Sequence, residues 1–142
     1  ARLDGRGHRV GFAILGGVYG EGVDYAGERL VGVVVVGTGL PGMTLEQELV
    51  AARHRERGRD GFDFAARYPG FTRVRQSAGR LIRGEGDRGV VALVDPRFSE
   101  TFYRRLLPPY WNTRWPRDVD ELSALLARFW AAAARGEPDE PD

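Results

Sequence analysis

The sequence contains no cysteine and no lysine, and it has only two histidines among its 142 residues. Because cysteine is absent, this chain cannot form a disulfide, a thiolate nucleophile or a cysteine-ligated metal centre. Because lysine is absent, the phosphate-binding loop that ends in Gly-Lys-Ser/Thr is absent as well. His8 and His54 stand far apart among polar neighbours, and we interpret both as surface residues. No serine–histidine–aspartate spacing and no metal-ligand spacing occurs, so the chain shows no complete active site.

Long hydrophobic runs are also missing. No apolar run approaches the roughly 18 residues that a membrane span requires, and there is no secretory signal. We therefore expect a soluble, intracellular protein. The length fits one domain with a core or a piece of a larger one, and the first residue is Ala1. We interpret both ends as cut from a longer chain.

The charge is nearly balanced overall but is unevenly distributed. All 21 basic residues are arginine, and the net charge is +1. Residues 51–83 carry nine arginines against three acids, whereas residues 118–142 carry seven acids against two arginines. This pattern favours an anionic partner for the middle of the chain. A GC-rich genome also produces arginine, so the positions of the arginines carry the argument rather than their number.

The hydrophobic pattern predicts an α/β fold. Apolar runs at residues 10–15, 30–36 and 90–94 predict strands, and the second run is unbroken enough to be buried on both faces. Strands that alternate with helices indicate a mostly parallel sheet, and three strands leave exposed sheet edges. Helices are predicted at residues 45–57, 62–67, 71–83 and 118–136. Their end signals are Thr44 with Gln47, Asp118 with Glu121, Gly58 and Gly136.

The stretch Gln76-Ser77-Ala78-Gly79-Arg80-Leu81-Ile82-Arg83 is the most informative in the chain. On one α-helix, Arg73, Gln76, Arg80 and Arg83 project within a wedge of about 80°. Phe71, Val74, Ala78, Leu81 and Ile82 fall on the opposite, packing face. Guanidinium groups bind phosphate oxygens through two parallel hydrogen bonds, so the polar stripe suits a phosphate ligand.

The alternative for this stretch is an ordinary solvated amphipathic helix. Two details disfavour it. No acid lies between Phe71 and Arg83, although solvated faces usually mix charges. Gly79 inside a helix costs about 1 kcal/mol relative to alanine, which suggests that another surface approaches closely there.

Two glycine-rich loops follow predicted strands. Residues 16–24 contain four glycines, and Glu21 and Asp24 offer acceptors to ribose hydroxyls or to a cation; a flexible loop with solvated acids is the alternative. Residues 37–42 fit the dinucleotide pattern G-x-G-x-x-G. A Rossmann fold would next need a strand that ends in an acid, but the arginine-rich residues 53–60 follow instead. We therefore favour a strand-to-helix turn without a nucleotide.

These motifs together resemble a known family. Gln76-x-x-Gly79-Arg80-x-x-Arg83 resembles motif VI of superfamily 2 helicases, and Gly17-x-x-Gly20-Glu21-Gly22-Val23-Asp24 resembles their motif V. Their order and spacing, over residues 10–111, are similar to those of the DinG/XPD-type DNA helicases. The resemblance implies a partial RecA-like (P-loop NTPase-type) domain with a mostly parallel sheet flanked by helices. We expect this domain at residues 1–117, a C-terminal helix at 118–136 and a disordered acidic tail at 137–142.

The resemblance also implies roles for particular residues. Arg80 and Arg83 would be arginine fingers that reach the γ-phosphate of ATP, and Gln76 would couple that phosphate to the other domain. Glu21, Gly22 and Asp24 would border the nucleotide. Tyr19, Gly20 and Arg73 are the candidate DNA contacts, with packing as the alternative for Tyr19; Gly20 replaces a serine that the family often has. Arginines at 53–59 are further candidates for contacts with single-stranded DNA.

The expected protein is thus part of an ATP-dependent DNA helicase in a bacterial-like cytoplasm, associated with the nucleoid. Its partners would be an N-terminal motor domain of the same protein and single-stranded DNA, with no membrane. That motor domain would bind most of the ATP and Mg²⁺, so the isolated chain should be inactive and hold no cofactor. Exposed sheet edges predict a dimer of the isolated chain. The alternatives are a non-catalytic nucleic-acid-binding module and, less favoured, a Rossmann dinucleotide-binding domain.

Overall fold

The computed structural model describes residues 10–17, 30–81 and 87–137. The chain divides into two compact units, Ala1–Glu100 and Thr101–Asp142, and each is described by itself. The expected division at residues 117 and 136 stays a prediction.

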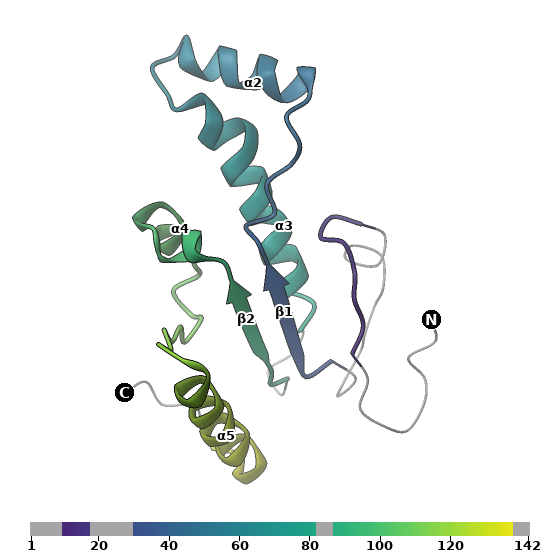
Figure 1. The fold of residues 1–142 in the computed structure, drawn as a ribbon, viewed down its shortest axis with the longest axis vertical. Helices are drawn as coiled ribbons and strands as arrows, with labels where there is room; N and C mark the ends of the chain where they lie inside the picture. The colour runs from purple at the N-terminus through teal and green to yellow at the C-terminus, as the bar shows by residue number, and fades with distance from the viewer. Residues whose placement is uncertain (1–9, 18–29, 82–86, 138–142) are drawn as a thin grey trace. The chain divides into compact units, whose positions relative to one another are not determined.

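A two-stranded parallel sheet forms the centre of the first unit (Figure 1). Strand β1 (Gly32–Val36) pairs with β2 (Val90–Val94) in the register Gly32↔Val90 to Val36↔Val94. The parallel α/β prediction is confirmed. The predicted bounds of β2 are correct, and those of β1 start two residues too early.

The predicted strand at residues 10–15 is wrong. Residues 10–14 have no regular structure and a turn follows at residues 15–16, although Val10, Phe12 and Ile14 alternate as a strand would and remain exposed. A strand needs a neighbour whose backbone completes its hydrogen bonds. No strand among the described residues pairs with this segment, so the pattern alone does not produce one.

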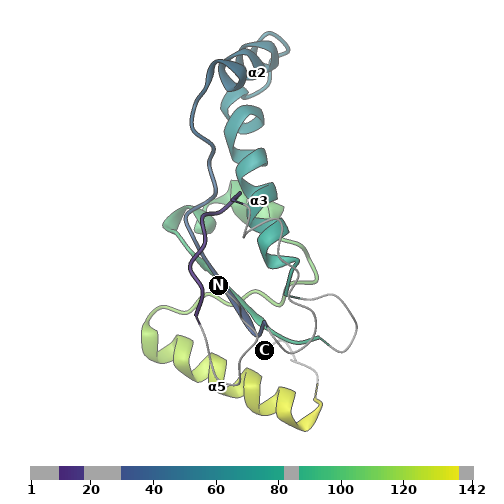
Figure 2. The ribbon, with the colours of Figure 1, turned by 90° about the vertical axis from the view of Figure 1, so that its right-hand side faces the viewer.

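Among the described residues, only one face of the sheet is covered, not both as predicted. Val35 is buried on the side of helix α3 (Tyr68–Ala78), which contacts β1, whereas Val34 and Val36 are 68% and 77% exposed. Figure 2 shows α3 along one side of the strands. Apart from glycines, the buried residues in the described part of this unit are Val35, Thr38, Ala51, Ala65, Ala66, Phe71, Val74, Ala78, Leu81 and Phe98. The predicted packing face of the arginine-bearing helix is therefore confirmed for its described members.

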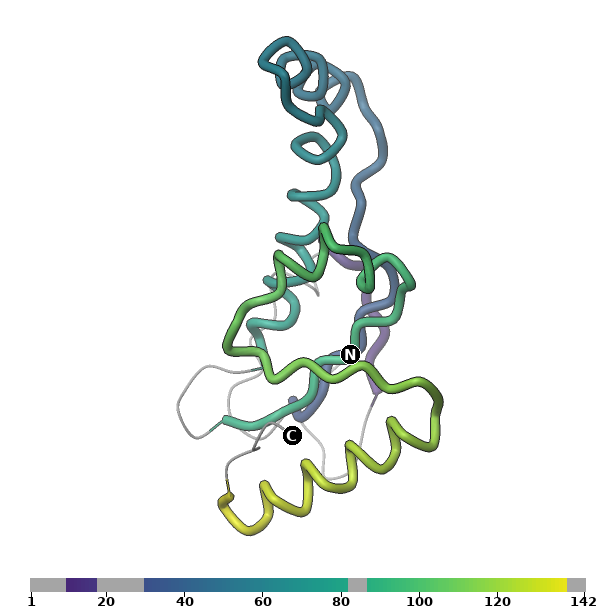
Figure 3. The backbone as a smooth tube through the Cα atoms, turned by 90° about the vertical axis from the view of Figure 1, so that its left-hand side faces the viewer, coloured from purple at the N-terminus to yellow at the C-terminus, as the bar shows by residue number. Residues whose placement is uncertain are grey.

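The connection from β1 to β2 contains helix α2 (Leu45–Arg55) and a longer helical run (Figure 3). The Thr44 N–H donates to Gln47 Oε1 (3.2 Å) at the start of α2, and Gly58, with a φ of +70°, follows its end. Gly61 crosses α2 so closely that a Cβ there would lie 2.3 Å from the carbonyl oxygen of Ala51. The helix predicted at residues 45–57 is thus confirmed to within two residues.

The longer run joins two helices that were predicted separately. A π-helical segment, η1 (Asp63–Arg67), continues into α3, and the Tyr68 N–H donates to the carbonyl of Asp63. Pro69 has no N–H to donate to the preceding turn, and a wider π turn accommodates this loss. The proline therefore changes the winding of the helix instead of ending it.

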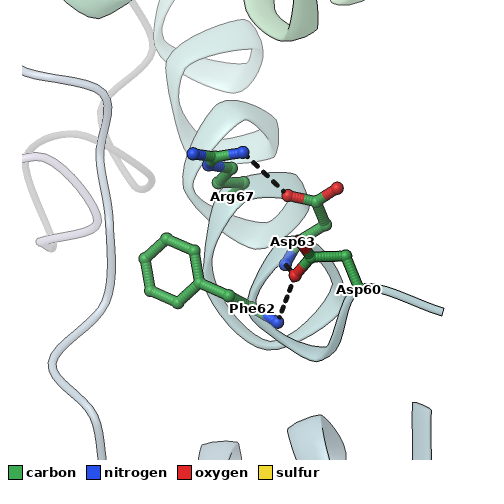
Figure 4. A network of polar contacts seen from close by, with 4 residues as sticks. All are labelled: Asp60, Phe62, Asp63 and Arg67. Atoms are coloured by element: carbon green, nitrogen blue, oxygen red, sulfur yellow. Dashed lines mark hydrogen bonds and ion pairs between the residues drawn. The ribbon is translucent and has the colours of Figure 1, made fainter. Parts of the chain in front are cut away.

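Side chains fix the start of this run (Figure 4). Asp60 Oδ1 accepts the N–H groups of Phe62 (2.8 Å) and Asp63 (3.1 Å), as an N-cap residue does. Asp63 in turn pairs with Arg67 at 3.1 Å, and the Arg67 guanidinium lies over the Phe62 ring. His54 of α2 stacks on Phe64 with ring centroids 3.9 Å apart, so it is half-buried and not a simple surface residue.

The second unit contains helices α4 (Thr101–Leu106) and α5 (Val119–Arg135). Asp118 Oδ1 accepts the Glu121 N–H at 2.8 Å, and Gly136 ends α5 with a φ of +73°, so both predicted end signals are confirmed. Glu137 pairs with Arg135, and the rest of the expected tail lies outside the described residues. No helix in the described part of the chain is long and apolar enough to cross a membrane.

Candidate functional site

The structure describes part of the predicted site. Tyr19, Gly20, Glu21, Gly22, Asp24 and Arg83 lie outside the described residues, as does His8. The described part includes Arg73, Gln76 and Arg80, together with Gly16 and Gly17 at the start of the first glycine-rich loop.

Helix α3 ends earlier than predicted. Its last residue is Ala78, and Gly79 is its C-cap with φ and ψ of −64° and −9°. The N–H groups of Arg80 and Leu81 donate to carbonyls three residues back, at Ser77 (3.4 Å) and Ala78 (3.0 Å). Arg80 therefore lies in a tight turn after the helix. The single helical stripe of four polar residues is wrong, because α-helical winding stops between Gln76 and Arg80.

Gly79 has a local role in the described structure. A Cβ at this position would meet the carbonyl oxygens of Arg75 (3.2 Å) and Gln76 (3.7 Å) and no other described segment within 4 Å. The predicted close approach of another surface is absent from the described residues. Instead, the residue marks the point where the helix tightens into the turn that bears Arg80.

Arg80 is held between two buried neighbours. Ala78 and Leu81 are 3% and 4% exposed, and Leu81 packs where a Cβ on Gly89 would lie 2.6 Å from it. Arg80 itself is half-buried, and its Nε atom is buried. Gln76, one helical turn earlier, is exposed. The backbone of the arginine-bearing turn is thus fixed by packing, which reduces the entropy lost when the guanidinium binds a ligand.

The second glycine-rich loop packs against α3. Gly39 has a φ of +69°, and a Cβ on it would lie 2.6 Å from the carbonyl oxygen of Gly70 and 2.8 Å from Leu15 Cδ2. A Cβ on Gly70 would lie 2.8 Å from the carbonyl oxygen of Thr38. In a dinucleotide site the glycines would leave room for a pyrophosphate. Here that room is filled by a helix, which supports the interpretation as a strand-to-helix turn.

Arg73 lies against the first glycine-rich loop. Gly16 has a φ of +82°, and a Cβ on it would lie 3.3 Å from Arg73 Cδ, 3.4 Å from Nε and 3.6 Å from Cζ. The Gly17 N–H donates to the carbonyl of Ile14 at 2.9 Å and closes a turn. Figures 1 and 2 both show the end of residues 10–17 beside α3. Helix α3 therefore contacts both glycine-rich loops.

The interaction between Asp95 and Arg97 was not predicted from the sequence. Asp95, directly after β2, accepts the Arg97 backbone N–H (2.9 Å) and two guanidinium bonds (2.8 and 2.7 Å) at the start of η2 (Pro96–Ser99). The side-chain bonds from Arg97 hold the pKa of Asp95 below its usual range. The Asp-Pro-Arg sequence was the available signal, since aspartate before proline often caps a helix start.

No group of three or more histidine, cysteine or acidic side chains that could hold a metal ion occurs within residues 10–17, 30–81 and 87–137. A parallel sheet flanked by helices, with an anchored arginine turn after α3, is typical of a RecA-like domain.

The sequence matches the family described as "Helicase C-terminal domain" over residues 3–114. It is 34% identical over 122 residues to the ATP-dependent helicase DinG of Mycobacterium tuberculosis. The aligned region covers 81% of this chain and 18% of that protein. It is 35% identical over 115 residues to the ATP-dependent DNA helicase YoaA of Escherichia coli, with coverage of 75% and 17%. It is 34% identical over 89 residues to the 3′-5′ exonuclease DinG of Bacillus subtilis, with coverage of 61% and 9%.

The chain belongs to the helicase C-terminal domain family, and its relatives are of the DinG type. The RecA-like fold class and the resemblance inferred from motifs V and VI are thereby confirmed. The chain spans less than a fifth of the length of these relatives.

Proposed function

We propose that this chain is part of an ATP-dependent DNA helicase and completes an ATP site that a first motor domain of the same protein mainly holds. The observation that carries the proposal is the placement of Arg80 in a turn anchored by buried Ala78 and Leu81. The names of two relatives, an ATP-dependent helicase and an ATP-dependent DNA helicase, supply the reaction class.

Arg80 and Arg83 act as arginine fingers in this proposal. Phosphoryl transfer spreads negative charge over the γ-phosphate oxygens, and a guanidinium group stabilises it through two parallel charged hydrogen bonds. An anchored donor stabilises the transition state without having to be ordered at the moment of reaction. Arginine fingers contribute factors of about 10³ to 10⁵ to turnover in such reactions. The exposed Gln76 on α3 would couple the γ-phosphate to the first domain.

The first glycine-rich loop contributes to the same proposed site and to DNA binding. Glu21 and Asp24, with the backbone of Gly22, would border the nucleotide. Tyr19 and Gly20 would contact single-stranded DNA. The third candidate, Arg73, lies with its side chain against Gly16, and for it we favour a packing role over a phosphate contact. Mg²⁺ and most of the contacts to ATP belong to the first domain in this scheme.

ATP turnover tests the proposal. We expect the full-length protein to hydrolyse ATP faster with single-stranded DNA, and this chain alone to show no turnover. Turnover by the isolated chain would contradict the two-domain site. A full-length protein that binds DNA but never hydrolyses ATP would instead favour the non-catalytic nucleic-acid-binding module.

The dinucleotide alternative has its own test. The close packing of Gly39 on Gly70 disfavours a pyrophosphate at that loop. We expect titration calorimetry with NADH to show no binding. Binding that is lost in a Gly37 or Gly39 variant would contradict our interpretation of this loop.

A further inference from the structure

The turn that leads into the motif V segment has a defined shape. Gly16 has a positive φ, which favours glycine, and the Gly17 N–H closes the turn on Ile14. Gly17 is also the first residue of the motif V pattern. The backbone direction with which the chain enters that pattern is therefore set at Gly16.

The side chain of Arg73 occupies the space that a side chain at Gly16 would need. The atoms that approach are Cδ, Nε and Cζ, at 3.3 to 3.6 Å from the ideal Cβ position. Arg73 is half-buried, and it makes no hydrogen bond or ion pair with the described residues. Its contact with the turn is therefore packing by the aliphatic stem and the inner part of the guanidinium group, as expected of a long amphipathic side chain.

The same helix carries the residues proposed to face ATP. Arg73 precedes Gln76 by three residues and Arg80 by seven, which places it about 10 Å along the helix axis from the arginine turn. Helix α3 is fixed to the neighbouring loop by the Gly39–Gly70 contact, and Leu15 packs on Gly39 as well. A displacement of α3 by the nucleotide would thus be transmitted to the turn at Gly16 through contacts in the described structure.

We propose that Arg73 is a positioning residue that links the ATP-facing end of α3 to the DNA-facing motif V loop by packing on Gly16. This inference rests on the proposed helicase function. The role belongs to the stem of the side chain, whereas a DNA phosphate contact would need its charge. A variant that keeps the stem but removes the charge therefore separates the packing role from a phosphate contact.

The test uses the full-length enzyme with Arg73→Met, Arg73→Ala and the matched control Arg75→Met. Arg75 is an exposed arginine two residues further along α3. The measured quantity is the ratio of ATP turnover at saturating single-stranded DNA to turnover without DNA. We expect Arg73→Ala to lower this ratio about tenfold, since mutations of residues that carry coupling change it by about 2- to 30-fold. Arg73→Met and Arg75→Met should stay within about twofold of the parent enzyme.

Salt dependence separates packing from charge. Removal of a phosphate contact lowers the slope of log affinity against log salt by about 1. We expect Arg73→Met to leave that slope and the stimulation ratio unchanged. A reduced slope with lost stimulation in Arg73→Met would overturn the positioning role in favour of a phosphate contact. Normal stimulation in Arg73→Ala would overturn it as well.

A double-mutant cycle with Gly16→Ala completes the test. The alanine Cβ would meet both a strained φ and the Arg73 side chain. We expect Gly16→Ala to lower the stimulation ratio. In the double variant with Arg73→Ala, the fold-reduction of this ratio should be clearly smaller than the product of the two single fold-reductions. If the two single fold-reductions simply multiply in the double variant, the residues act independently and the proposed contact is contradicted. Failure of the helicase proposal is recognised separately, because the parent enzyme would then show no DNA-stimulated turnover at all.

Discussion

Gly39 and Gly70 meet backbone to backbone where the loop after β1 crosses α3. A Cβ on Gly39 would lie 2.6 Å from the carbonyl oxygen of Gly70, a distance that real Cβ atoms do not adopt. The contact joins two segments that are far apart in the sequence. It also explains a glycine pattern that would otherwise suggest a dinucleotide site.

Gly70→Ala is predicted to destabilise the protein. In a helix without such a contact, alanine would be favoured over glycine by up to about 1 kcal/mol. Here the new methyl group would press on the backbone of Thr38 and Gly39, and we expect a net loss of about 1–3 kcal/mol. Urea unfolding measures the change. Gly42→Ala is the control, because nothing lies within 4 Å of its Cβ position; equal midpoints for the two variants would contradict the close crossing.

The Asp95–Arg97 pair predicts a pH dependence of stability. The pKa of Asp95 is lowered in the folded state, so its contribution is complete above the unfolded pKa. The contribution is lost as the pH falls below about 4 and through the lower folded-state pKa. Asp95→Asn keeps a capping oxygen but removes the charge, and we expect it to cost roughly 1 kcal/mol at pH 7. The difference between parent and variant, measured by denaturant unfolding, should shrink towards pH 2. A difference that does not change with pH would rule out the ion pair as its source.

The exposed side of the sheet predicts self-association of the isolated chain. Val34, Val36 and Val94 are exposed, and Val36 pairs with Val94 in the register of the sheet. Exposed valines on strands whose outer edges pair with no other described strand favour association with a second copy. Sedimentation velocity should show a concentration-dependent dimer that Val36→Thr weakens. Val119→Thr, which changes an equally exposed valine on α5, should leave it unchanged. A chain that stays monomeric at high concentration would refute this expectation.

Local chemistry was predictable from the sequence. The bounds of β2 and the end signals at Asp118 and Gly136 follow from side chains that act on neighbouring backbone groups. Features that depend on distant partners were not predictable. Residues 10–15 alternate as a strand does, but strand formation requires a partner that the described chain does not provide.

In the candidate site, too, local features were predictable from the sequence and contacts between distant residues were not. Periodicity identified the buried face of α3 correctly, because that face is a repeated local pattern. It could not show that the helix stops at Ala78, because a short run of helical spacing continues beyond that residue. The contact between Arg73 and Gly16 joins residues with no local relationship in the sequence, so only the structure reveals it.

The role of Arg80 is the central claim, and one comparison tests it most directly. The measurement is DNA-stimulated ATP turnover of the full-length enzyme with Arg80→Ala beside Arg75→Ala, together with the ATP affinity of each. Our account predicts that Arg80→Ala lowers turnover by about 10³ or more while ATP still binds, because the finger acts mainly in the transition state. Arg75→Ala should turn over ATP normally. Near-normal turnover in Arg80→Ala would contradict the account.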